Sequence, residues 1–164
     1  MKVFLGADEN ALELKRAIAE KLGEMGVEFE DLGKFSAANT ELYPDVVKRV
    51  CDRIIDGGYQ DRGILFCGTG IGVCLTANKF KGIYAAVGSD IYSAERSILS
   101  NDCNVLCFGS LVVGPALACR IVEEWLPLKF VPSRSSVKVK RLREIEEENY
   151  RQVGKSHEEV TDQQ

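Results

Sequence analysis

Histidine is almost absent from the sequence, which contains only His157, close to the C-terminal end. Histidine is the side chain that titrates nearest to neutral pH and the commonest metal ligand in proteins. We therefore expect neither histidine-based catalysis nor histidine metal ligation in the core of the protein.

Cysteine pairs with the spacing Cys-x-x-Cys, which is typical of zinc sites and redox motifs, are also missing. Most of the cysteines fall in apolar strand or helix patterns, so we expect neither a disulfide framework nor a metal site. Free thiols are typical of a reducing cytoplasm, which is the predicted location. The six cysteines are Cys51, Cys67, Cys74, Cys103, Cys107 and Cys119.

The sequence has no excess of basic residues and no long apolar run. Its 21 lysines and arginines are outnumbered by 25 acidic residues, whereas nucleic-acid-binding proteins usually present a basic face. No apolar stretch approaches the roughly 18 residues of a membrane helix, and Met1–Asp8 is typical of a first strand, not of a signal peptide. We expect no nucleic acid and no membrane among its partners. A chain of 164 residues can form one domain with a sizeable core.

Short apolar segments alternate with helical patterns up to Trp125. Strands separated by helices indicate an α/β fold, in which a five-stranded parallel sheet is covered on both faces. Ligands of such sheets bind at the carboxyl ends of the strands. The predicted strands are Lys2–Gly6, Val27–Leu32, Gly63–Phe66, Ile83–Val87 and Asn104–Phe108; the predicted helices are Ala11–Met25, Tyr43–Ile55, Ile71–Lys79, one from Tyr92 capped by Ser89 or Asp90, and one from Gly114-Pro115 to Trp125.

The pattern changes after Trp125. A linker at residues 131–136 leads to Val137–Gln152, which predicts a highly charged helix with few apolar positions. Such a helix has little reason to fold on its parent domain alone, so we expect it to reach a neighbouring subunit. The predicted organisation is an α/β domain at residues 1–130, the charged helix within 131–152 and a flexible tail at 153–164.

The most informative segment is Arg62–Gly72, a strand that ends at Cys67 and continues through a glycine-rich turn into a helix. A thiol at a helix N-terminus lies among unpaired backbone N–H groups, which favour the thiolate. Gly68, Gly70 and Gly72 allow a close approach of the backbone to an anion. The turn lacks the dinucleotide fingerprint and the P-loop lysine. A tight strand–helix connection and a buried structural cysteine therefore remain competing interpretations.

Other polar residues have an ordinary interpretation beside a functional one. Asp8 follows the first strand and could cap the next helix, bind a ligand, or do both. Arg134 and Lys138 lie four residues apart at the predicted start of the last helix, either as a solvated face or as an anion clamp. The segment Asn101–Asn104 precedes the fifth strand and could be a plain turn.

These motifs, in this order, resemble the ribose-5-phosphate isomerase B / galactose-6-phosphate isomerase family from about Met1 to Gln152. The resemblance implies a Rossmann-like three-layer α/β/α sandwich with an extended C-terminal helix. It also implies a homodimer or tetramer with the active site between subunits, and aldose–ketose isomerisation through an enediolate without metal or cofactor. The segments that carry the resemblance are Gly63–Gly72, Ala77–Lys79, Gly82-Ile83, Ser89–Ala94, Asn101–Leu106 and Phe108–Ser110.

By family position, the resemblance assigns Cys67 as the base that removes a proton beside the carbonyl, with Thr69 as a polar helper. The N–H groups of Gly68–Gly72 would hold the enediolate oxygen. Asp8 would bind sugar hydroxyls, Tyr43 would line the pocket, Asn101 would come from the other subunit, and Arg134 and Lys138 would face a phosphate. The implied substrate-binding residues are Asp8, Glu9, Tyr43, Gly68, Gly70, Ile71, Gly72, Asn101, Arg134 and Lys138.

Four positions depart from the family pattern. Glu9 stands where the family usually has histidine after the aspartate, and Ser100 stands where a histidine proposed to open the sugar ring usually precedes Asn-Asp. Leu111 replaces a common arginine, and Lys138 replaces the second C-terminal arginine. Serine is a poor proton shuttle near neutral pH, and the changes at Glu9 and Leu111 together remove positive charge and add a negative one.

We therefore predict a sugar-phosphate aldose–ketose isomerase with a cysteine base, and ribose 5-phosphate/ribulose 5-phosphate as the default pair. Ser100 brings in a competitor, a tetrose 4-phosphate, which cannot close a five- or six-membered ring through its free hydroxyls. The sequence is also compatible with a hexose 6-phosphate isomerase, with a non-catalytic subunit of a hetero-oligomeric isomerase, and with an isomerase of a non-phosphorylated or carboxylated sugar.

Overall fold

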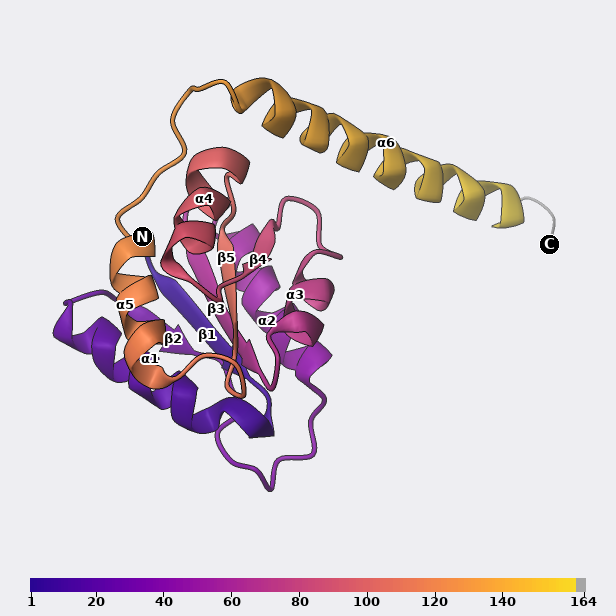
Figure 1. Ribbon diagram of the computed structural model, residues 1–164. Helices are drawn as coiled ribbons and strands as arrows, with labels where there is room; N and C mark the ends of the chain where they lie inside the picture. The colour runs from indigo at the N-terminus through magenta and orange to yellow at the C-terminus, as the bar shows by residue number, and fades with distance from the viewer. Residues whose placement is uncertain (162–164) are drawn as a thin grey trace. The chain divides into compact units, whose positions relative to one another are not determined.

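The computed structural model describes residues 1–161, with side chains described for residues 1–151. Its five strands form one parallel sheet in the order β2-β1-β3-β5-β4 (Figure 1). This arrangement confirms the predicted α/β fold with a five-stranded parallel sheet. The strands are β1 (Val3–Ala7), β2 (Phe29–Asp31), β3 (Arg62–Cys67), β4 (Ala85–Val87) and β5 (Val105–Gly109).

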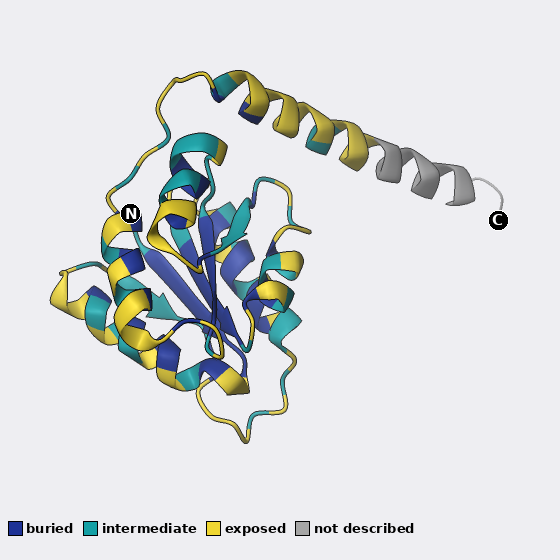
Figure 2. Ribbon diagram, viewed as in Figure 1, coloured by how far each residue is buried: buried dark blue, intermediate teal, exposed yellow. Residues whose placement is uncertain are grey.

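Helices cover both faces of the sheet, so the fold has three layers (Figure 1). One face packs against α1 (Leu12–Glu24), α4 (Ile91–Asn101) and α5 (Pro115–Trp125), and the other packs against α2 (Tyr43–Asp56) and α3 (Ile71–Ala77). The three central strands, β1, β3 and β5, are buried along their length except for Arg62 (Figure 2). Burial from both sides explains why these segments are continuously apolar in the sequence.

Alternation along β3 assigns its side chains to the two layers. Ile64 and Phe66 pack in the core with α1, α4 and α5, whereas Leu65 and Cys67 pack in the core with α2 and α3. The side-chain period of two in a strand accounts for this division. Cys67 therefore ends its strand on the side of α2 and α3.

Two helix starts differ in detail from the predictions. The first helical segment begins as a 3-10 turn, η1 (Glu9–Ala11), and only then continues as α1, because the Asp8 carboxylate accepts the Asn10 N–H at 2.9 Å and tightens the first turn. At α4, the helix begins at Ile91, one residue before the predicted Tyr92, and the cap is Asp90, one of the two predicted candidates. Its carboxylate accepts the Ser93 N–H at 2.7 Å.

The chain divides into two compact units, Met1–Phe130 and Val131–Gln164. In the second unit, α6 spans Ser136–Thr161, and the Ser136 hydroxyl accepts the Ser133 N–H at 2.9 Å at its start. The helix continues past the predicted end at Gln152, because one glycine within a charged helix costs only about 1 kcal/mol. Residues 162–164 of the predicted tail lie outside the described residues. Within the described part of the chain, no helix is both long and apolar enough to cross a membrane.

Candidate active site

Two of the predicted site residues, Asp8 and Cys67, lie where neighbouring central strands end. Asp8 follows β1, Cys67 ends β3 and Ser110 follows β5, and these strands are neighbours in the sheet. Parallel strands bring their carboxyl ends to one edge, and each chain there turns toward a helix. The topology therefore places Asp8, Cys67 and the segment after β5 side by side, although they are far apart in the sequence.

The segment Cys67–Gly72, called the Cys67 turn below, holds a thiol against the backbone. The Gly70 N–H donates to Cys67 Sγ at 3.1 Å, and the Cys67 side chain is buried. Gly70 has φ +78° and is the residue before α3, a left-handed conformation that favours glycine. The arrangement of thiol and backbone N–H that the sequence predicts is therefore present.

The Thr69 hydroxyl lies at the start of α3. Its Oγ1 accepts the Ile71 N–H at 3.3 Å, so the oxygen is used as an acceptor while its own hydrogen remains available to donate. Thr69 is exposed, so this donor is accessible to a ligand. Thr69 can therefore contribute a second hydrogen bond to a ligand bound over the turn.

Close backbone packing fixes the Cys67 turn on the end of β5. A Cβ atom at Gly109 would lie 2.5 Å from the carbonyl carbon of Thr69, and one at Gly70 would lie 3.1 Å from the Gly109 nitrogen. A Cβ at Gly72 would lie 2.8 Å from the Tyr43 hydroxyl, so Tyr43 rests on the first turn of α3. Gly70 and Gly109 are required because no side-chain atom fits between their two backbones, whereas Gly72 leaves room for the Tyr43 side chain.

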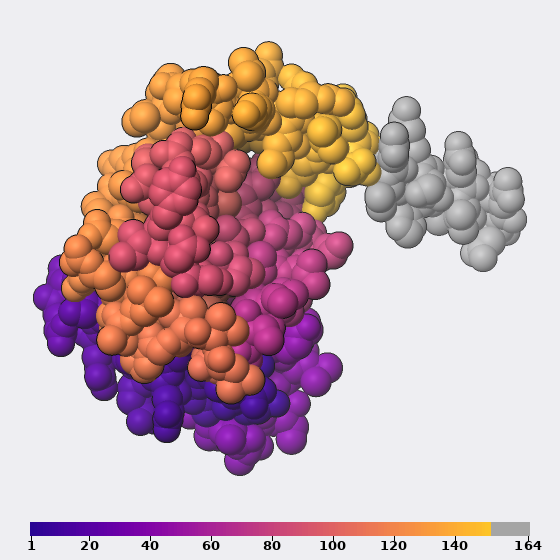
Figure 3. Space-filling view, in the orientation of Figure 1, coloured from indigo at the N-terminus to yellow at the C-terminus, as the bar shows by residue number. Residues whose placement is uncertain are grey.

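The loop after β5 also binds the turn through its backbone. The Ser110 N–H donates to the Cys67 carbonyl at 2.9 Å, and the Leu111 N–H donates to the Gly68 carbonyl at 3.0 Å. The Ser110 hydroxyl donates to the Asn10 carbonyl at 2.8 Å. Figure 3 accordingly shows the orange segment after β5 lying against the indigo start of the chain.

Asp8 is both a helix cap and a buried carboxylate. Its side chain accepts the Asn10 N–H, and its own backbone N–H donates to the Phe66 carbonyl at 3.0 Å next to Cys67. Burial raises the pKa of Asp8 above its ordinary value, and the hydrogen bond from Asn10 acts in the opposite direction. The structure thus confirms the capping interpretation and places the carboxylate beside the Cys67 strand end.

Glu9 has a partner that sequence reasoning missed. The Lys34 Nζ lies 2.5 Å from Glu9 Oε2, and the Lys34 side chain is only 5% exposed. This hydrogen bond from Lys34 lowers the pKa of Glu9. A lysine in a loop usually indicates a solvated surface, and only the backbone pairing of Lys34 with Ala7 brings it to β1.

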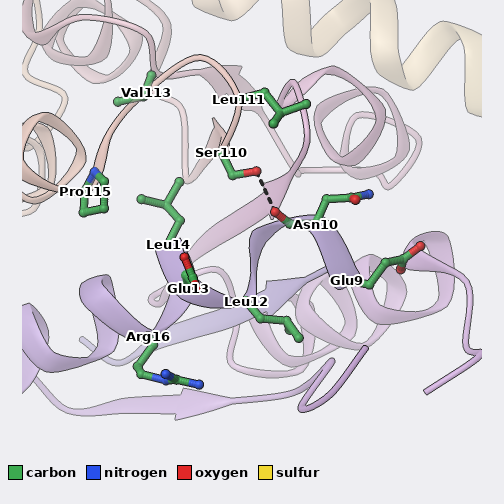
Figure 4. A pocket seen from close by; sticks show the side chains of 10 residues that line it. All are labelled: Glu9, Asn10, Leu12, Glu13, Leu14, Arg16, Ser110, Leu111, Val113 and Pro115. Carbon is green, nitrogen blue, oxygen red and sulfur yellow. Dashed lines mark hydrogen bonds between the residues drawn. The ribbon is translucent and has the colours of Figure 1, made fainter. Parts of the chain in front are cut away.

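A cavity of about 550 Å³ adjoins this edge of the sheet (Figure 4). Glu9 and Leu111 both contribute to its lining, and the Leu111 side chain is 82% exposed beside Gly68. In Figure 4, the hydrogen bond from Ser110 to Asn10 joins two of its walls. The lining residues are Glu9, Asn10, Leu12, Glu13, Leu14, Arg16, Ser110, Leu111, Val113 and Pro115.

Ser100 and Asn101 do not join this group within one chain. They are in the last turn of α4, which runs back from the carboxyl edge of the sheet and leads into β5 at the opposite edge. The Ser100 hydroxyl accepts Arg96 Nη2 at 2.6 Å and Arg96 Nε at 3.0 Å. The intervening sheet therefore separates both residues from Cys67 of the same chain.

Arg134 and Lys138 belong to the second unit. Arg134 precedes α6, which begins at Ser136, whereas Lys138 is in the first turn. The two side chains therefore do not occupy successive turns of one helix, contrary to the prediction. The described side chains include no group of three or more residues suited to a metal ion.

Comparisons with known proteins agree with the sequence pattern. A family model described as Ribose/Galactose Isomerase matches residues 3–142. Ribose-5-P isomerase B of Listeria innocua is 44% identical over 91% of this chain and 99% of its own length. D-erythrulose-4-phosphate isomerase of Pectobacterium atrosepticum is 40% identical over 87% of this chain and 93% of its own length.

A crystal structure of ribose-5-phosphate isomerase B from Mycoplasma genitalium, with bound ribulose-5-phosphate, has the same fold. Its TM-score is 0.84 and its sequence identity 33%, and the match covers 90% of this chain and 97% of that one. These matches span the sheet, its helices and the start of α6 and confirm the resemblance noted in the sequence. The chain is an aldose–ketose isomerase of the ribose/galactose isomerase family.

Proposed function

We propose that this protein interconverts the aldose and ketose forms of a sugar phosphate through an enediolate, with Cys67 as the base and ribose 5-phosphate/ribulose 5-phosphate as the default pair. The observation that carries the proposal is the 3.1 Å hydrogen bond from the Gly70 N–H to Cys67 Sγ. This contact fixes the sulfur at the start of α3, among the backbone N–H groups of the glycine turn. Relatives at this similarity include enzymes named for ribose-5-phosphate isomerisation.

The residues around Cys67 fit the other needs of this chemistry. Removal of a proton from the carbon beside the carbonyl leaves negative charge on oxygen, which needs hydrogen-bond donors in place beforehand. The Gly70 N–H already donates to Cys67 Sγ and the Ile71 N–H to Thr69 Oγ1, so we assign this role to the N–H groups of Gly68, Thr69 and Gly72 and to the Thr69 hydroxyl. Asp8 is placed to bind sugar hydroxyls, and Tyr43, which rests on Gly72, lines the same side.

In this proposal, a second subunit supplies the remaining residues of the site. Ser100 and Asn101 lie across the sheet from Cys67 of their own chain, so they reach a Cys67 turn only in a partner. The second unit carries Arg134 and Lys138, two exposed cations for a phosphate. We propose a homodimer, or a tetramer built from two dimers, in which these residues cross to the neighbouring site.

A tetrose 4-phosphate is the second candidate substrate, and Ser100 favours it. The Ser100 hydroxyl is already bound twice by Arg96, and serine is a poor proton donor near neutral pH. A pentose phosphate arrives mainly as a ring that must be opened, whereas a tetrose 4-phosphate needs no such step. One relative at 40% identity is named D-erythrulose-4-phosphate isomerase.

The test is a substrate panel with tetrose, pentose and hexose phosphates on the purified protein, with Cys67→Ala measured in parallel. We expect turnover of at least one phosphate by the wild type and loss of turnover in Cys67→Ala. A faster rate on D-erythrulose 4-phosphate than on ribulose 5-phosphate would select the tetrose. Activity unchanged in Cys67→Ala would remove Cys67 as the base, and a protein that turns over no sugar phosphate would contradict the proposed function.

A further inference from the structure

Lys34 is a buried lysine held at the edge of the site. Its backbone N–H donates to the Ala7 carbonyl at 3.2 Å, and its carbonyl accepts Lys15 Nζ at 2.7 Å. Lys15 is itself buried and paired with Asp31 at 2.7 Å. These bonds fix the main chain of Lys34 against the end of β1, and its ammonium donates to Glu9 Oε2.

The charge of Lys34 acts on three nearby acids, Asp8, Glu9 and Glu41. It lowers the pKa of Glu9 and acts against the burial that raises the pKa of Asp8. The pKa of Glu41 is lowered chiefly by its hydrogen bond with Arg49, and Lys34 contributes to the same direction. Lys34 is thus the cation that faces the acidic residues at the end of β1.

Glu9 connects this cation to the cavity, whose lining meets the Cys67 turn only through Ser110 and Leu111. Its side chain is 48% exposed and lines the cavity together with Ser110 and Leu111. Ser110 and Leu111 in turn bind the carbonyls of Cys67 and Gly68. An unpaired Glu9 carboxylate at this place would repel a phosphate dianion, and Leu111 provides no cation to offset it.

We propose that Lys34 is a positioning residue that determines specificity, because it neutralises Glu9 and so permits a phosphorylated sugar to bind beside Asp8 and Glu9. The inference rests on the proposed function, since it takes a sugar phosphate as the ligand. It reverses the expectation from sequence, in which Glu9 adds an uncompensated negative charge. The pair is neutral overall, and Glu9 keeps the ammonium fixed in a buried place.

The experiment measures inorganic phosphate binding by calorimetry, and KM and kcat for ribose 5-phosphate and D-erythrulose 4-phosphate. Lys34→Met leaves Glu9 unpaired, and we expect phosphate Kd and KM to rise about tenfold with a smaller change in kcat. Glu9→Gln leaves the Lys34 ammonium with a net positive charge, and we expect the phosphate Kd and the KM to fall about threefold. The double variant Glu9→Gln/Lys34→Met and the variant Lys34→Arg should return to within about threefold of the wild type.

Lys48→Met is the matched control, because it removes the same charge from the exposed Lys48–Asp52 pair on α2. If Lys34→Met does not fold, the change of phosphate affinity in Glu9→Gln decides whether the inference holds. A Lys34–Glu9 ion pair with a purely structural role predicts no gain in phosphate affinity in that variant. Equal phosphate affinities in wild type, Glu9→Gln and the double variant overturn the inference. If those affinities are equal but Cys67→Ala loses turnover, the inference about Lys34 fails and the proposed function stands. If the wild type shows no turnover, the proposed function fails, and the phosphate affinities still decide the inference about Lys34.

Discussion

The Cys67 turn and the rim beside it, which comprises Glu9, Lys34 and Leu111, are held by different forces. Backbone hydrogen bonds from Gly70, Ser110 and Leu111 bind the turn, and glycines fill positions where a Cβ would collide. The rim is made of side chains, from the buried Lys34 to the 82% exposed Leu111.

This difference separates the reaction from its specificity. A turn held by its backbone resists sequence change, because each contact is independent of the side chain that provides it. Rim side chains can be exchanged without moving the turn. The departures from the family pattern in the first unit, at Glu9, Ser100 and Leu111, accordingly lie outside the Cys67 turn.

The largest expected effect comes from the turn itself. Cys67→Ala removes the base, and we expect kcat to fall at least about 1,000-fold with little change in KM, because the hydroxyl- and phosphate-binding groups remain. Steady-state kinetics on the best substrate of the panel measure this. Cys67→Ser, which keeps the size but not the acidity of the thiol, is the control. A residual rate near that of the wild type would mean that another group removes the proton.

Next is Gly109→Ala, which tests whether the backbone packing is required. The new Cβ would lie 2.5 Å from the Thr69 carbonyl carbon, so the turn must move. We expect about 1–3 kcal/mol of lost stability, and a displacement of the turn should lower kcat about 100-fold. Thermal unfolding and kinetics measure the two. Gly23→Ala in α1, where nothing lies within 4 Å, is the control and should not lose activity.

Asp8→Asn tests a residue that lies between the Cys67 turn and the rim. Burial raises the pKa of Asp8, so the native state binds its proton more tightly than the unfolded chain does, and this carboxyl reduces stability as the pH rises past its unfolded pKa. Asparagine keeps the cap without a charge, so we expect a higher Tm at pH 7 and no gain at a pH below that unfolded value. Weaker binding of sugar hydroxyls should raise KM about tenfold. A lower Tm at pH 7 would contradict the burial argument.

Leu111→Arg should have the smallest effect on the kinetics, and it should improve substrate binding where the other substitutions weaken activity or binding. The side chain at 111 is exposed beside Gly68, so an arginine fits without repacking and adds a cation near the rim. We expect KM for a sugar phosphate to fall about threefold, since exposed charges interact weakly. The gain should disappear at high salt, and Leu111→Met should change nothing. A gain of the same size on a non-phosphorylated sugar would show that charge is not the cause.

Local patterns were sufficient for most of the fold. The predicted strand Gly63–Phe66 lies within β3, the predicted helix Tyr43–Ile55 is α2 less one residue, and Gly114-Pro115 opens α5 as expected. Such segments are long or strongly apolar, so their structure depends little on distant residues. The 3-10 turn of η1 was missed, because the capping contact of one side chain decides it, whereas the start of α6 at Ser136 is within one residue of the predicted Val137.

In the candidate site, too, some residues could be found from local sequence patterns and others could not. Cys67 and its glycines could be found in the sequence, because strand, turn and helix are contiguous there. Lys34 could not, since its role depends on β2 pairing with β1 and on the loop that follows. Nor could the position of Ser100 across the sheet, which depends on the direction of α4.

The sequence by itself determined the alternating elements, the thiol at the end of a strand and the glycine turn, because each depends on neighbours within a few residues. Only the tertiary structure decided that Glu9 is paired, that Leu111 lies beside Gly68, and that Ser100 lies across the sheet from Cys67. The physical reason is that charge compensation and burial are properties of residues close in space. The chain brings those residues together only when the parallel sheet aligns its strand ends.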